Sequence, residues 1–177
     1  FTGYTADNGE GRVVALVRDG KEVPFAQVGD EVTVITNQTP FYGESGGQVG
    51  DAGVIVAAPG SATGDLRINV TSTAKPLGRL HAMNGEVQVG KISVGDTILL
   101  SVDTARREAI RANHSATHLL HAALRNRLGG HVSQKGSLVA EERLRFDFSH
   151  PKPLSDEDIA EIEAAVNAEI RHNDPVT

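Results

Sequence analysis

The pattern of hydrophobic and polar positions along the chain changes near residue 103. Before this point, short apolar runs rich in β-branched residues alternate with turn signals, and three of the runs cover residues 32–36, 54–57 and 98–102. Short strands at such intervals are typical of a small β-barrel or sandwich. We therefore expect residues 1–103 to form a β-barrel subdomain.

Two dipeptides in this region suit the two-residue turns of β-hairpins. Asp19-Gly20 separates residues 12–18 from residues 21–27, and Asn84-Gly85 separates residues 80–83 from residues 86–89. Asn, Asp and Gly tolerate the positive φ angles that such turns require. Each dipeptide therefore predicts a hairpin.

Helical periodicity replaces this pattern from Thr104. Residues 104–128 contain no Gly or Pro, and their apolar side chains recur at the spacing of one helix face. Gly129-Gly130 follows and is a typical helix terminator. We expect one helix over residues 104–128, packed on a sheet.

The rest of the chain predicts two strands and a second helix. Residues 132–139 and 144–148 have strand-like patterns. Ser155 precedes three acidic residues, as expected for an N-cap and a favourable first helical turn, and the helix should reach about His172. The fold class is therefore α+β, with a second domain over residues 104–177 that we expect to be incomplete.

Composition narrows the class of protein. The 177 residues are 39% hydrophobic and 23% charged, and no apolar run approaches the ~18 residues of a membrane span. The chain has no cysteine, so it forms no disulfide and offers no thiolate ligand, which fits a cytoplasmic protein. The net charge of -6 argues against general nucleic-acid binding but leaves a local basic patch open. Because the chain starts at Phe1 without a leader, we expect a piece of a longer protein.

His114 and His118 are the strongest candidates for metal binding. They are four residues apart on the predicted helix, so both imidazoles lie on one face and can share an ion, most plausibly zinc. The alternative is a histidine pair without a metal. His121 follows near the same face, as a bystander or a competing ligand.

The segment from Phe41 to Asp51 is unusually rich in glycine. Such a loop can expose backbone N–H groups to a carboxylate, phosphate or ribose, which makes Ser45, Gly46, Gly47 and Gln48 candidate substrate-binding residues. A tight turn between barrel strands is the alternative.

Two further features are ambiguous. Gln134, in the polar segment 132–139, could position a water or a carbonyl in a cleft, or it could lie on a solvated hairpin edge. Five arginines on the first predicted helix could face RNA phosphates or form an ordinary solvated face; they are Arg106, Arg107, Arg111, Arg125 and Arg127.

Taken in order, the motifs resemble the editing region of the alanyl-tRNA synthetase family. The resemblance rests on residues 39–51, on the His-x-x-x-His motif at 114–121, and on residues 131–138 and 143–150. It extends over essentially the whole chain. It implies a β-barrel of the translation-factor type followed by an α+β editing core shared with threonyl-tRNA synthetase.

The resemblance also implies a reaction and roles for individual residues. The reaction is hydrolysis of tRNA(Ala) mischarged with serine or glycine, without a membrane partner. His114 and His118 would bind zinc, Thr117 would help to select the amino acid, and Gln134 would lie in the editing pocket, so that Thr117 and Gln134 are the candidate catalytic residues. We expect His114 and His118 to face a common cleft with Gln134 nearby.

The family completes its zinc site with a later Cys-x-x-x-His motif, so we expect two further ligands beyond Thr177. ATP and Mg are expected only for the full-length synthetase, whose remaining chain would be a partner of this segment. The segment alone is expected to be inactive. A freestanding editing hydrolase and a non-catalytic tRNA-binding module are the alternatives.

Overall fold

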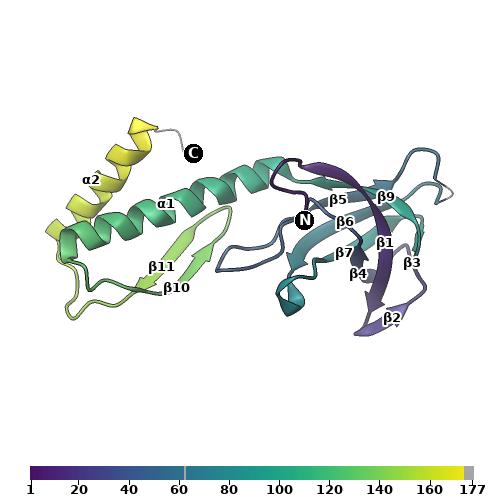
Figure 1. Ribbon diagram of the computed structural model, residues 1–177, viewed down its shortest axis with the longest axis horizontal. Coiled ribbons are helices and arrows are strands. Elements are labelled where there is room, and N and C mark those ends of the chain that lie inside the picture. The colour runs from purple at the N-terminus through teal and green to yellow at the C-terminus, as the bar shows by residue number, and fades with distance from the viewer. Residues whose placement is uncertain (62, 174–177) are drawn as a thin grey trace. The chain divides into compact units, whose positions relative to one another are not determined.

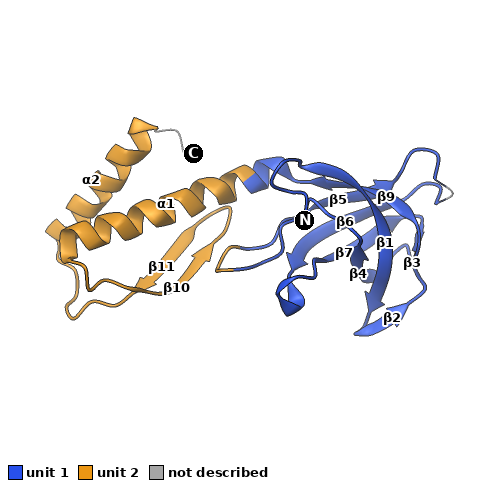
Figure 2. Cartoon of the chain, viewed as in Figure 1, with its two compact units in different colours: residues 1–45, 49–107 blue, residues 46–48, 108–177 orange. Residues whose placement is uncertain are grey.

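The computed structural model describes residues 1–61 and 63–173 and divides them between two compact units (Figure 2). The first unit holds residues 1–45 and 49–107, and the second holds residues 46–48 and those from 108 onward. The first unit thus includes residues 104–107, the first turn of the helix predicted over residues 104–128. The predicted boundary between residues 103 and 104 stays a prediction, and residues 174–177 lie outside the described chain.

Six strands of the first unit close into a β-barrel (Figure 1). All neighbouring strands are antiparallel, and the first half of β1 pairs with β9 while its second half pairs with β4. The predicted barrel is thereby confirmed, and the three predicted apolar runs lie in β4, β5 and β9. In hydrogen-bonding order the strands are β1 (Asn8–Arg18), β4 (Glu31–Thr36), β7 (Ala82–Val89), β6 (Arg67–Ala74), β5 (Gly53–Ala57) and β9 (Thr97–Val102).

Smaller elements extend the barrel. β2 (Lys21–Val23) pairs with β1, and β3 (Phe25–Gln27) pairs with β8 (Lys91–Ser93). A short 3₁₀ helix covers Pro76–Gly78.

Alternate positions of the barrel strands point inward, as the two-residue period of a strand requires. The largest fully buried side chains include Leu16, Phe41, Ile55, Ile68, Met83, Ile98 and Leu100.

The hairpin predicted at Asp19-Gly20 is confirmed. Arg18 pairs with Lys21, so β1 and β2 are joined by a two-residue turn. Asp19 and Gly20 have φ angles of 50° and 73°. Two consecutive positive φ angles belong to the turn type whose twist matches that of the flanking strands.

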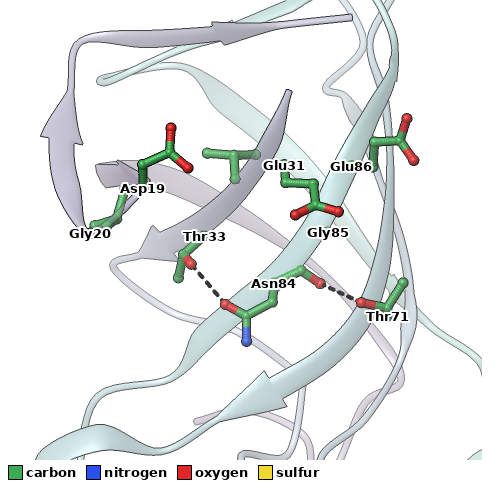
Figure 3. Close-up of a pocket in the computed structure, with 10 residues that line it drawn as sticks. Asp19, Gly20, Glu31, Thr33, Thr71, Asn84, Gly85 and Glu86 are labelled. Atoms are coloured by element: carbon green, nitrogen blue, oxygen red, sulfur yellow. Dashed lines mark hydrogen bonds between the residues drawn. The ribbon is translucent and has the colours of Figure 1, made fainter. Parts of the chain in front are cut away.

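The turn predicted at Asn84-Gly85 is wrong, because β7 runs through both residues (Figure 3). A Cβ atom on Gly85 would lie 2.2 Å from the carbonyl oxygen of Asn69, so this glycine permits a close approach of β6. The side chain of Asn84 accepts a hydrogen bond of 2.7 Å from the hydroxyl of Thr33, which lies on the neighbouring strand β4. Both residues therefore lie within β7, where Gly85 leaves space for β6 and Asn84 bonds to β4.

Gly85→Ala is expected to destabilise the chain by about 1–3 kcal/mol, because the added methyl must displace backbone atoms of β6. Urea unfolding of the 177-residue chain measures the effect. Gly9→Ala in β1 is the matched control, since a Cβ there would meet nothing nearer than 3.7 Å. Equal unfolding free energies for the two variants would contradict this explanation of Gly85.

The second unit contains most of α1 (Thr104–Leu128), a hairpin of β10 (Gln134–Val139) and β11 (Leu144–Phe148), and α2 (Asp156–His172). These elements confirm the predicted helices and strands, although β10 starts two residues later than the segment predicted from residue 132. Ser155 caps α2 in a capping box with Asp158. The fold is thus α+β, as predicted.

A small core holds the second unit together. Ala123, Leu124, Val132 and Ile162 are buried at its centre. Phe146 and Phe148 of β11 pack against them, which confirms that α1 packs on a sheet containing residues 143–148. Among the described residues, neither helix combines the length and the apolar composition that crossing a bilayer requires.

Candidate functional site

The glycine-rich segment is anchored at its two ends inside the first unit. Asp51, only 2% exposed, accepts a hydrogen bond from the backbone N–H of Tyr42 at 2.6 Å and forms an ion pair with Arg107. Its own N–H donates to the carbonyl of Tyr42 at 2.9 Å. Arg107 also contacts Asp7 at 2.7 Å and the carbonyl of Pro40 at 2.5 Å. Buried charges fix both ends of the loop.

The apex of the segment, residues 46–48, belongs to the second unit and lies against β10. Val139 donates its backbone N–H to the carbonyl of Gly47 at 2.8 Å, and Gln48 forms a parallel bridge with the same residue. Gly46 and Gly47 have φ angles of 61° and 88°, and a Cβ on Gly47 would collide with Ser137. The glycines therefore allow the apex to lie along the edge of the hairpin.

His114 and His118 form a stacked pair on α1. Their ring centroids are 5.1 Å apart with an interplanar angle of 22°. The two side chains share one face of the helix because they are separated by one turn. This is the arrangement that the His-x-x-x-His spacing predicted.

Gln48 contacts this pair from the apex of the glycine-rich segment. Its Oε1 lies 2.5 Å from Nδ1 of His114. An amide oxygen only accepts hydrogen bonds, so Nδ1 carries the proton and Nε2 keeps a free lone pair. Burial, and then the neighbouring His118, lower the pKa of His114 below its ordinary value. Both effects favour the neutral imidazole, which is the form that binds a metal.

The chemistry of the pair suits two positions of a metal site. No group of three or more His, Cys, Asp or Glu side chains that could hold an ion occurs within residues 1–61 and 63–173. A structural zinc site has four ligands, and a catalytic one has three plus a water. The two imidazoles fit half of a four-ligand site. The Gln48 amide on Nδ1 of His114 is the kind of partner that metal-binding histidines have on the nitrogen that does not face the metal.

Thr117 lies one residue before His118 and is 7% exposed. Its hydroxyl donates to the carbonyl of Asn113 at 2.8 Å, so the oxygen can still accept a hydrogen bond but has no proton left to donate. Asn113 in turn donates its side-chain amide to the carbonyl of Ala140 at 2.7 Å. This bond joins α1 to the end of β10.

Gln134 lies at the opposite end of β10, where it pairs with Phe148. At about 3.3 Å per residue, it is roughly 16 Å along the strand from Val139, the residue that pairs with Gln48. Its side chain is exposed and forms no hydrogen bond to another residue in the described part of the chain. The structure thus brings Gln48 into contact with the histidine pair, whereas Gln134, which we expected near the pair, lies at the far end of β10 from the residue that Gln48 pairs with.

His121 is turned toward the hairpin. Its ring lies 5.0 Å from that of Phe146, between centroids. Its Nε2 atom is buried and has no hydrogen-bond partner among the described residues. The ring of His121 therefore contacts the core of the second unit, whereas His114 stacks on His118.

Most of the arginines that could have formed an RNA-binding face have partners within their own unit. Arg106 donates to the carbonyl of Gly50 at 2.8 Å, and Arg107 is buried against carboxylates. Arg111 pairs with Glu108 at 2.8 Å, and Arg127 pairs with acidic residues of α2. These contacts favour the structural interpretation of the basic helix over the RNA-binding one.

Two pockets lie apart from the predicted site residues. One, about 410 Å³ in volume, lies on the barrel beside Asp19, Glu31 and Glu86 (Figure 3). The other, about 400 Å³, is an apolar groove between α1, β11 and α2 that includes Leu120 and Ile162. None of the residues predicted to bind metal or substrate lines either pocket.

Comparisons with known proteins identify the family. The family model described as tRNA synthetases class II (A) matches residues 1–106. The chain is 64% identical over its whole length to the alanine–tRNA ligase of Sphingopyxis alaskensis and 63% identical to that of Rhizorhabdus wittichii, and it covers 20% and 19% of those proteins. It is 56% identical over 173 residues to the alanine–tRNA ligase of Acidithiobacillus ferridurans, of which it covers 19%. The chain therefore spans about a fifth of the length of the curated relatives it matches. Since the family model covers more than half of the chain, the chain belongs to the class II (A) tRNA synthetase family.

Proposed function

We propose that the chain is part of an alanine–tRNA ligase and that its second unit contributes to a site that hydrolyses Ser-tRNA(Ala) and Gly-tRNA(Ala). The observation that carries this proposal is the stacked pair of His114 and His118 with the Gln48 amide on His114 Nδ1. The similarity to alanine–tRNA ligases over the whole chain supports tRNA(Ala) as the substrate and the rest of that ligase as the partner.

The chemistry of alanine explains why such an enzyme needs a second hydrolytic site. A pocket built for alanine gains only about 1–3 kcal/mol from the methyl group that glycine lacks. A small pocket also excludes the extra hydroxyl of serine imperfectly. Binding alone cannot reject either competitor strongly, so hydrolysis of the wrong ester restores accuracy.

Zinc fits the histidine pair in this proposal. His114 and His118 would hold two of its positions, and the rest of the synthetase chain would supply the remaining ligands. Bound zinc would supply Lewis-acid chemistry at an ester carbonyl or a water. Gln48 keeps the proton of His114 on Nδ1, so that Nε2 is the nitrogen available to the ion.

Thr117 is the proposed reader of the serine hydroxyl. Since its own proton is donated to Asn113, Thr117 must accept the hydrogen bond, and serine must donate it. The segment Ser45–Gln48 is proposed to contact the substrate next to the histidine pair, and Gln134 keeps its proposed place in the editing pocket. The proposal thus assigns serine selection to the acceptor oxygen of Thr117.

The finer family features complete the proposal. The barrel would be of the translation-factor type, and the second unit would be the first part of an editing core shared with threonyl-tRNA synthetase. The full-length enzyme would use ATP and Mg for aminoacylation and would act in the cytoplasm.

Gln48→Leu in the full-length synthetase is expected to lower both zinc retention and the rate of Ser-tRNA(Ala) hydrolysis by about 10–100-fold, the usual cost of losing an outer hydrogen bond to a metal ligand. Gln48→Glu keeps an acceptor oxygen and should retain most of both. Metal analysis and deacylation assays measure the two quantities. Gln88→Leu, at an exposed barrel position, is the control and should change neither. Wild-type behaviour of Gln48→Leu would remove Gln48 from this role.

A further inference from the structure

A second histidine pair lies at the base of the β10–β11 hairpin. Nε2 of His131 is 2.9 Å from Nδ1 of His150, and the two rings stack with centroids 5.1 Å apart. The residues come from two segments of chain, one just before β10 and one just after β11. Neither residue contributes to the proposed editing chemistry.

The surrounding residues hold the two rings in place. Val132, next to His131, is fully buried in the core of the second unit. The two segments are joined by a hydrogen bond from the N–H of Ser149 to the carbonyl of Ser133 at 3.0 Å and by a hydroxyl contact of 2.8 Å between the same serines.

Gly129 makes room for the first ring. Its φ angle is 114°, and a Cβ on this residue would lie 3.1 Å from Nδ1 of His131. The buried valine and the paired serines hold the backbone on both sides of the pair, while Gly129 leaves space for the ring. Little ordering of the chain is therefore left for a ligand to impose.

The distance between the nitrogens matches that of two ligands on one ion. Imidazole nitrogens bind a divalent transition metal at about 2.0–2.1 Å, so two nitrogens at an angle of 90° are roughly 2.9 Å apart. At the tetrahedral angle they are roughly 3.3 Å apart. The observed 2.9 Å is the ordinary length of a hydrogen bond between the two rings, and it brings the two nitrogens within the range that one ion can span. Among the divalent first-row metals, Cu²⁺ binds nitrogen ligands most tightly.

We propose that His131 and His150 form a two-histidine binding site for a divalent transition metal ion, best suited to Cu²⁺ or Ni²⁺. Binding of the ion breaks the hydrogen bond between the two rings. The ring that donated this hydrogen carries it on its other nitrogen instead, so two neutral imidazoles bind without a net release of protons. Water fills the other positions, because no third His, Cys, Asp or Glu joins the pair among the described residues.

Calorimetric titration with Cu²⁺, together with electron paramagnetic resonance, tests this site. The background is a His114→Ala/His118→Ala chain, in which the pair on α1 cannot contribute. One Cu²⁺ with two nitrogen ligands is expected to bind this background. Adding His131→Gln, or separately His150→Gln, should weaken binding at least about 10-fold, since one imidazole of two is lost.

His172→Gln, at an exposed position of α2, is the matched control and should leave the affinity unchanged. Circular dichroism checks that each variant is folded. If one of the two substitutions prevents folding, the other still tests the site. Unchanged Cu²⁺ affinity in folded His131→Gln and His150→Gln chains would overturn the proposal. So would the absence of stoichiometric binding by the background chain.

Discussion

A full-length synthetase that carries His118→Ala is expected to hydrolyse Ser-tRNA(Ala) at least about 100-fold more slowly than the wild-type enzyme, because even the loss of an outer partner of a metal ligand costs 10–100-fold. His118 is one of only two imidazoles that the chain brings together on α1. Formation of Ala-tRNA(Ala) should not change, since aminoacylation would use a different part of the enzyme. Single-turnover deacylation and aminoacylation assays measure both rates.

His172→Ala is the control for this prediction. His172 ends α2, and its side chain is exposed. Its loss should alter neither reaction. If His118→Ala edits at the wild-type rate, the histidine pair does not belong to the hydrolytic site.

Arg107→Leu is expected to destabilise the chain by about 3–5 kcal/mol, because it leaves a buried carboxylate without its counter-ion. The Arg107 side chain is 10% exposed and that of Asp51 only 3%. Urea unfolding of the 177-residue chain measures the change. The loop from Tyr42 to Asp51 should loosen at the same time, because Asp51 joins the two ends of that loop.

Arg111→Leu is the matched control. Its ion pair with Glu108 is exposed, with 69% and 66% of the two side chains accessible, and such pairs contribute about 0–1 kcal/mol. A double variant, Arg107→Leu with Asp51→Leu, should recover part of the lost stability, since it removes the unpaired charge. Equal losses for Arg107→Leu and Arg111→Leu would show that burial of the ion pair is unimportant.

The regular elements could be predicted because they follow local patterns. The period of apolar residues located α1, and the N-cap at Ser155 with its acidic first turn located α2. The β-branched runs located three of the barrel strands, β4, β5 and β9. The two turn dipeptides show the limit of such reasoning. Asp19-Gly20 closes a hairpin, whereas Asn84-Gly85 has the same turn chemistry but lies within β7, where the backbone of β6 comes close. Local sequence does not reveal that approach.

The candidate site was predictable in part for a similar reason. The stacking of His114 on His118 follows from helical spacing alone. The contact of Gln48 with His114 joins residues 66 positions apart, and it depends on how the glycine-rich apex lies along β10. Gln134 was expected beside the histidines, but the register of the hairpin places it at the other end of its strand.

Arg107 illustrates a residue whose local pattern was misleading. It lies in a run of helical arginines that suggested a solvated or RNA-binding face. Its partners are separated from it by 56 to 104 positions in the sequence. Only the closed barrel brings the glycine-rich loop and the N-terminal segment to this side chain.

In the proposed enzyme, the chain provides two ligands and one wall of an editing site that the rest of the synthetase completes. Single-turnover hydrolysis of Ser-tRNA(Ala) by the full-length synthetase and by the isolated 177-residue chain, both supplied with zinc, tests it most directly. Rapid hydrolysis by the full-length enzyme and a rate close to the uncatalysed one for the isolated chain are predicted. A full-length enzyme no faster than the uncatalysed reaction would contradict the editing function, and equal rates for the two proteins would contradict a site completed from outside the chain.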